Sequence, residues 1–119
     1  LKSFVTLLAI ESRYSKTSLE IDNRNFTVQI LRFDNGSFVC ITEGQNKIGG
    51  MLASIGTGSV PVSNMIIPAK SESLFLKLIS ERLSSIIKGI NIVSAFIPQE
   101  LDGKTANTLI AKIKEFVEK

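Results

Sequence analysis

The sequence predicts an α+β fold, in which a mostly antiparallel sheet of about six strands carries two helices on one face. The first half of the chain holds runs of β-branched and aromatic residues, and the second half holds two amphipathic helical patterns separated by one more strand pattern. The length of 119 residues, of which 44% are hydrophobic, fits a single domain over residues 1–119 with one core.

The first 25 residues predict a strand followed by a polar loop. Residues 3–11 are apolar at both odd and even positions, as in a strand that is covered on both faces. Residues 12–25 are rich in Ser, Asn, Arg and Lys. We expect a loop there, with an extended segment beginning near Leu19 and Ile21.

A β-hairpin is predicted next. Residues 26–33 and 37–43 are β-branched and aromatic runs with partial alternation. The pair Asn35 and Gly36 between them favours a type I′ turn, because both central residues of that turn need positive φ. The two runs are therefore expected to pair as neighbouring antiparallel strands.

Both faces of this hairpin are apolar. A two-residue turn would give the cross-strand pairs Phe33 with Phe38, Leu31 with Cys40, and Gln29 with Thr42. The opposite face would carry Val28, Ile30, Val39 and Ile41, with Arg32 near the turn. A sheet with one solvated face alternates cleanly between apolar and polar residues, so this pattern predicts that both faces are covered.

Two more strands are expected before the first helix. A turn at 44–47 leads into residues 48–55, where Gly49–Gly50 indicates a bulge or a close approach of another backbone. Residues 60–67 are again extended, and Pro61 is typical of a strand at the edge of a sheet.

Two amphipathic helices are predicted at 72–88 and 104–118, on either side of a strand at 90–97. Gly89 fits the residue that follows the end of the first helix, and Asp102 fits the N-cap of the second. The first apolar stripe consists of Leu76, Ile79, Leu83, Ile86 and Ile87. The second consists of Ala106, Leu109, Ile110, Ile113, Phe116 and Val117.

Two helices can cover only one face of such a sheet, so the second apolar face needs a partner. One hairpin face holds small β-branched residues that suit a core beneath helices. The other mixes aromatic anchors with polar groups, which is typical of a non-obligate interface. We therefore predict dimerisation through this second face, with the partner-binding residues Gln29, Leu31, Phe33, Phe38 and Cys40.

The composition argues against catalysis. The chain has no His, which removes the commonest general base, the Ser-His and Cys-His pairs, and most zinc sites. The carboxylates of Glu20, Asp22, Asp34 and Glu43 form no convincing acid–base pair. We predict that the protein is not an enzyme and has no catalytic, metal-binding or cofactor-binding residues.

Charge and cysteine content bear on partners and compartment. The 14 basic and 11 acidic residues are scattered along the sequence, so we expect neither a nucleic acid nor a membrane partner. Cys40 is the single cysteine and cannot form an internal disulfide; we expect it to act as a small structural hydrophobe. No secretory leader is visible, and the cytoplasm is the expected location, with the nucleus left open.

The order of these features resembles the proteasome assembly chaperones, in particular chaperone four of the three/four pair. The resemblance runs from about Asn25 to the C-terminus. It is carried by Asn25-Phe26, by the Phe38–Ile41 strand after a short hairpin, by Pro61-Val62-Ser63, by Arg82-Leu83 in the first helix, by the Asn91–Ile97 strand, and by Ile113-Lys114-Glu115 in the last helix.

This resemblance implies a non-catalytic chaperone that forms a heterodimer with a sister chaperone. It further implies that the pair helps α-type proteasome subunits to assemble into a ring. Two alternatives remain open. One is a small-ligand or nucleotide-binding domain that uses the glycine-containing segment Gly49–Ser59, although no helix pattern follows that segment directly. The other is a generic homodimeric adaptor.

Overall fold

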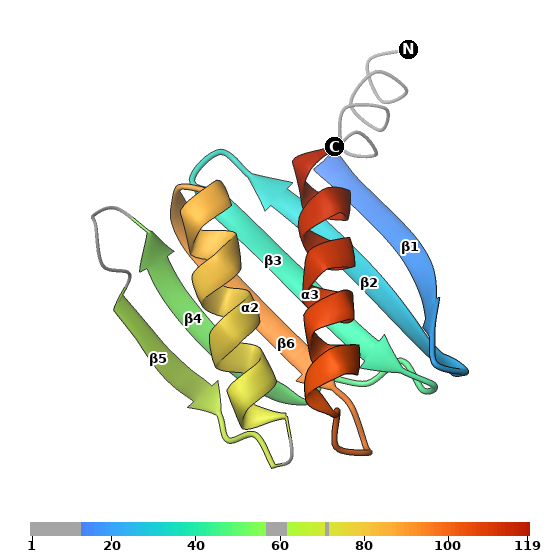
Figure 1. The fold of residues 1–119 in the computed structure, drawn as a ribbon. Coiled ribbons are helices and arrows are strands. Elements are labelled where there is room, and N and C mark those ends of the chain that lie inside the picture. The colour runs from blue at the N-terminus through green and yellow to red at the C-terminus, as the bar shows by residue number, and fades with distance from the viewer. Residues whose placement is uncertain (1–12, 57–61, 71) are drawn as a thin grey trace.

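The computed structural model of the chain describes residues 13–56, 62–70 and 72–119 (Figure 1). These residues form one six-stranded sheet with two helices. The strands are β1 (Tyr14–Ile21), β2 (Arg24–Phe33), β3 (Gly36–Glu43), β4 (Gly50–Gly56), β5 (Val62–Ile67) and β6 (Gly89–Phe96). The helices are α2 (Ser73–Ile86) and α3 (Gly103–Glu118). The predicted α+β class is confirmed, whereas the strand predicted at 3–11 lies outside the described residues.

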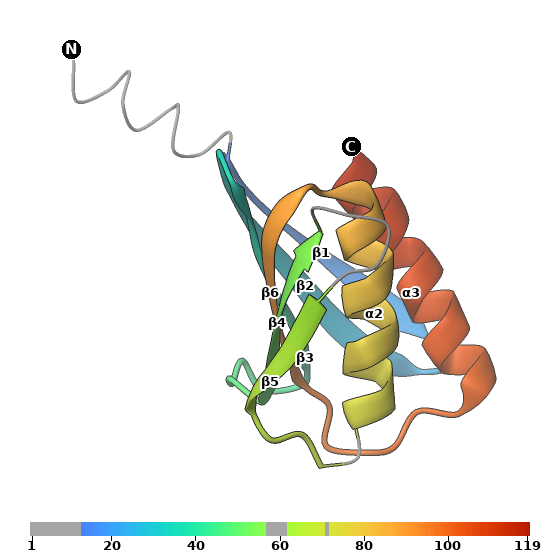
Figure 2. The ribbon, with the colours of Figure 1, turned by 90° about the vertical axis from the view of Figure 1, so that its left-hand side faces the viewer.

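The strand order in the sheet is β1-β2-β3-β6-β4-β5. β6 follows α2 in the sequence and lies between β3 and β4, parallel to β3 and antiparallel to β4. The other neighbours are antiparallel, so β1 and β5 form the two edges. Figure 2 shows both helices on the same side of the sheet, with α2 and α3 running side by side in the same direction in Figure 1.

The core lies between the sheet and the two helices. The strands contribute side chains that are fully buried, among them Phe26, Val28, Ile30, Val39, Ile41 and Val93. The helices contribute Leu76, Ile79, Leu83, Leu109 and Ile113, which are the central members of the two predicted stripes. Burying each of these side chains contributes about 1.5–3 kcal/mol, so this one layer supplies most of the favourable free energy of folding.

The prediction of a loop at 12–25 is wrong, because Tyr14–Ile21 forms edge strand β1. Its side chains alternate between exposed and partly buried, and β2 is its one neighbour among the described strands. An edge strand with one solvated face can be largely polar, which is why the composition resembled a loop. Asp22 and Asn23 connect β1 to β2 with φ values of 51° and 63°, the positive values that a type I′ turn requires.

The hairpin between β2 and β3 forms, but its predicted register is wrong by two residues. The turn consists of Asp34 and Asn35, and Leu31 rather than Phe33 pairs with Phe38. Gly36 belongs to β3, where an added Cβ would lie 1.8 Å from the carbonyl oxygen of Ile90. The glycine is therefore needed for close strand packing and not for the turn. A shift of two residues preserves the side-chain parity, so the assignment of residues to faces is correct.

The end of α2 also differs from the expectation. The helix ends at Ile86, and the extended Ile87 is its C-cap, with an amide that donates to the Leu83 carbonyl at 2.7 Å. Gly89 is not the residue that ends the helix; it begins β6 with a φ of +98°. An added Cβ there would lie 2.1 Å from the carbonyl oxygen of Asn35, so the β2–β3 turn packs directly against this glycine.

Polar contacts fix the start of α3 against the sheet. Arg24 donates to both carboxylate oxygens of Glu43 at 2.7 Å and to the carbonyls of Gln99 and Glu100. The hydrogen bonds to Glu43 raise the pKa of the Arg24 guanidinium. Asp102 caps the helix as predicted, and the hydrogen bond from the Thr105 amide, 2.7 Å long, lowers the pKa of its carboxyl.

The close approach predicted at Gly49–Gly50 gives a test of this packing. A Cβ at Gly49 would lie 2.1 Å from the carbonyl oxygen of Ala95, so Gly49→Ala must push two backbones apart. We expect a loss of about 1–3 kcal/mol in the free energy of unfolding, the range seen for overpacked sites. Chemical denaturation measures this change. Gly103→Ala is the control, since nothing lies within 4 Å of its added Cβ; equal stability of the two variants would contradict the packing.

Candidate partner-binding surface

The face of the sheet that points away from α2 and α3 is called the open face below, and no helix or strand of the described residues covers it in Figure 2. Directly paired residues in a sheet point to the same side, so the strand register defines its composition. One row across the strands consists of Leu31, Phe38, Ile92, Ala53 and Asn64. The next row consists of Phe33, Gly36, Ile90, Ile55 and Val62. On the other side of the first row lie Gln29, Cys40, Ser94, Met51 and Ile67.

The five predicted partner-binding residues all lie on this face. Leu31 pairs with Phe38 and Gln29 pairs with Cys40, which makes them direct cross-strand neighbours. Phe33 is 54% exposed and Leu31 is 37% exposed, while the remaining three side chains are half-buried. The sheet therefore brings the five residues into one continuous patch on β2 and β3.

The apolar part of the open face extends beyond the predicted residues. Ile90 and Ile92 of β6 adjoin β3, and Met51 and Ile55 of β4 continue the surface towards the edge. These residues were missed because the sequence does not show that β6 separates β3 from β4. The alternation of Ile90, Ile92 and Ser94 along β6 was the available signal, since it places the two isoleucines on one side.

The open face of β2 to β5 carries no charged side chain among the described residues. The charged residues of this face, Lys16 and Glu20, lie on edge strand β1. Charge is depleted at the centre of protein interfaces, whereas it is common on solvated surfaces. A contiguous apolar surface without charge is unusual for a chain that stays alone in water.

Polar groups on the open face are already oriented by the fold. The Tyr14 hydroxyl donates to Oε1 of Gln29 at 2.8 Å, and the Gln29 amide donates to Asn46 at 3.3 Å. Gln29 is thus held between β1 and the loop after β3. Burial raises the pKa of the Cys40 thiol, which makes it a poor nucleophile at neutral pH.

The carboxylates considered as catalytic candidates mostly have structural partners. Asp34 accepts from Arg13 at 2.6 Å, Glu43 accepts from Arg24, and Asp22 accepts from the Thr105 hydroxyl at 2.9 Å. In the described part of the chain, no three His, Cys, Asp or Glu residues are grouped to hold a metal ion. No described helix is long and apolar enough to span a membrane.

The segment considered for ligand binding lies partly in β4. Gly49 and Gly50 pack against the backbone of Ala95 and against Ala69, which accounts for the absence of side chains there. Residues 57–59 lie outside the described residues. A recess of about 470 Å³ adjoins the two glycines and includes Phe96 and Lys70 in its lining.

The comparisons with known proteins concern the fold. No protein-family model and no curated protein matches the sequence. The structure matches a chain of the crystal structure of a novel chaperone complex for yeast 20S proteasome assembly. The TM-score is 0.64 at 14% sequence identity, over 89% of this chain and 96% of that chain. The chain shares its fold with that chain. At such low identity the likeness concerns the fold, and it spans nearly the whole of both chains.

The half-buried Cys40 gives a test of the open face in the isolated chain. Because burial raises its pKa, a smaller fraction of Cys40 is thiolate at pH 7.5 than for a free cysteine. We expect slow alkylation by iodoacetamide, with a pH profile displaced to higher pH relative to free cysteine. Mass spectrometry of timed samples measures the rate. Labelling as fast as in the urea-unfolded chain would contradict the burial.

Proposed function

We propose that the protein is a non-catalytic proteasome assembly chaperone that pairs with a second chaperone subunit through the open face. The observation that carries this proposal is the match of the fold to a chain of a proteasome assembly chaperone complex over 89% of the sequence. The more specific assignment to chaperone four rests on the sequence resemblance.

The open face supports the pairing. It presents adjoining apolar rows with Phe33 and Phe38 as aromatic anchors and with charge confined to the β1 edge. A second sheet stacked on it at about 10 Å would bury these rows and leave the helices outside. The proposed partner is therefore a sister chaperone with a similar uncharged sheet face.

The proposed task of the pair is to promote assembly of the α-subunit ring of the proteasome in the cytoplasm, with the nucleus as a second location. No bound group is needed for that task, because the free energy comes from surfaces that the chaperone covers and later releases. The surface for the α-type subunit would differ from the open face, since the sister chaperone occupies that face.

The direct test is affinity purification of the tagged chain from its source cells, followed by mass spectrometry and native gels. We expect a small sister chaperone in equal amount and α-type subunits without mature proteasomes. A homodimer without these proteins would favour the adaptor. A thermal shift with nucleotide, lost on changing Lys70 beside the recess to Ala, would favour the ligand-binding alternative.

Neighbouring residues of β3 provide a matched pair of variants for the pairing surface. Phe38 lies on the open face, and Val39 is fully buried beneath the helices. We expect Phe38→Ala to weaken binding to the sister chaperone by about 2 kcal/mol, close to thirtyfold in Kd, as for an aromatic hot spot. Titration calorimetry with the purified partner measures this loss.

Val39→Ala should instead lower the melting temperature of the isolated chain, because it leaves a cavity in the core. Its affinity for the partner should change little while it remains folded. If Phe38→Ala keeps full affinity but destabilises the isolated chain, the two faces have the opposite roles and the pairing model fails.

A further inference from the structure

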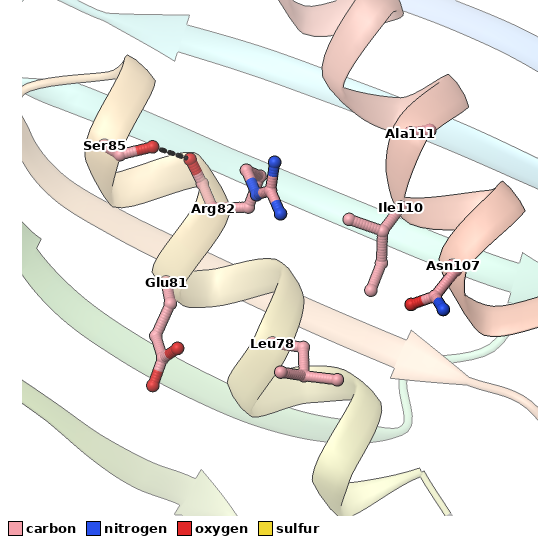
Figure 3. Close-up of a pocket in the computed structure, with 7 residues that line it drawn as sticks. All are labelled: Leu78, Glu81, Arg82, Ser85, Asn107, Ile110 and Ala111. Carbon is pink, nitrogen blue, oxygen red and sulfur yellow. Dashed lines mark hydrogen bonds between the residues drawn. The ribbon is translucent and has the colours of Figure 1, made fainter. Parts of the chain in front are cut away.

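The outer surface of the helix layer carries a groove between α2 and α3, called the helix groove below. One part, about 400 Å³ in volume, is lined by Leu78, Glu81, Arg82, Ser85, Asn107, Ile110 and Ala111 (Figure 3). A second part, about 180 Å³, lies towards the N-terminal ends of both helices and also includes Leu78 and Asn107. The two parts are therefore continuous along the line between the helices.

The two parts differ in chemistry. The N-terminal part is mainly apolar, with Phe75, Ile97, Leu101 and Ala106 among the residues that line it. Leu74 and Leu78 lie one turn apart on α2 beside this part and are 67% and 40% exposed. Both leucines are solvent-exposed on the side of α2 that faces the recess. Exposed apolar side chains at such a place indicate a surface that binds apolar side chains.

The other part holds one charged group that faces inward. Figure 3 shows the Arg82 side chain extending from α2 towards α3, while Glu81 points away from α3. No acidic residue of the described ranges forms an ion pair with Arg82, although its backbone carbonyl accepts from the Ser85 hydroxyl at 2.6 Å. The guanidinium is therefore available for a carboxylate, which it can bind in a bidentate manner.

We infer that the helix groove binds an amphipathic helix of a partner protein that carries a carboxylate one turn beyond its apolar stripe. Leu78 and Arg82 are four residues apart, about 6 Å along α2, which equals roughly one helical turn of an occupant lying along the groove. Two side-by-side helices offer a natural groove for a third. Glu100 lines the apolar end of the groove, and its charge favours a basic group at the end of the occupant remote from the carboxylate.

This inference does not depend on the proposed chaperone role, because the groove lies on the face of the molecule opposite to the open face. Charge complementarity at Arg82 is the source of selectivity. Lys77 is an exposed cation on the same helix that lines neither part of the groove. It therefore serves as the matched control for changes in overall charge.

The test uses two synthetic helical peptides titrated into the isotope-labelled full chain and followed by two-dimensional NMR. Both peptides carry leucines at i, i+3 and i+4; one has glutamate one turn beyond the stripe, and the other has lysine there. We expect the glutamate peptide to shift the amide signals of Leu78, Arg82 and Asn107. We also expect it to bind about fivefold more tightly at low salt than the lysine peptide, the size of a favourable surface ion pair.

Charge reversal decides the outcome. Arg82→Glu should invert the preference, Arg82→Gln should abolish it, and Lys77→Glu should leave the preference as in the unchanged chain. Equal binding of both peptides, an unchanged preference in Arg82→Glu, or shifts confined to the open face would overturn the inference. Concentration-dependent shifts at the groove without peptide would also overturn it, because the occupant would then be a second copy of this chain.

Discussion

The buried side chain of Asn91 in β6 joins the elements on which the rest of the structure depends. Its amide nitrogen donates to the carbonyl of Ile87 at the end of α2, and its amide oxygen accepts from the Ser37 hydroxyl of β3 at 2.7 Å. The hydroxyls of Ser54 in β4 and Ser84 in α2 lie 2.7 Å apart in the same buried layer. An unpaired amide in this position would cost several kcal/mol, so the network favours the observed position of β6 between β3 and β4.

This placement of β6 explains why the sheet is covered on one side. α2 leads into β6 and packs on β4 and β6, and α3 follows β6 and packs towards β1 (Figure 1). Both connections place the helices on the same face. No described helix or strand covers the apolar rows of β2, β3, β6 and β4 on the other face. The surface proposed for pairing is thus a direct result of the topology and not a separate feature added to it.

The sequence predicted those parts of the fold that depend on local pattern. The stripes of α2 and α3, the Asp102 cap and the division of the hairpin into two faces all follow from side-chain periodicity and local hydrogen bonding. It did not predict the details that depend on distant backbone. Gly36 and Gly89 were assigned to a turn and to a helix end, yet each is required by a close contact with another strand or turn. β1 was missed because an edge strand needs few apolar residues.

The two surfaces have different physical characters, and this difference favours different roles. The described residues of the open face from β2 to β5 are largely apolar and uncharged, so binding there would be driven by buried area and would change little with salt. The helix groove is narrower and combines exposed leucines with a single inward cation, Arg82. Binding there would gain selectivity and salt dependence from charge. In the proposed chaperone role, the open face suits a lasting pair and the helix groove suits a transient client.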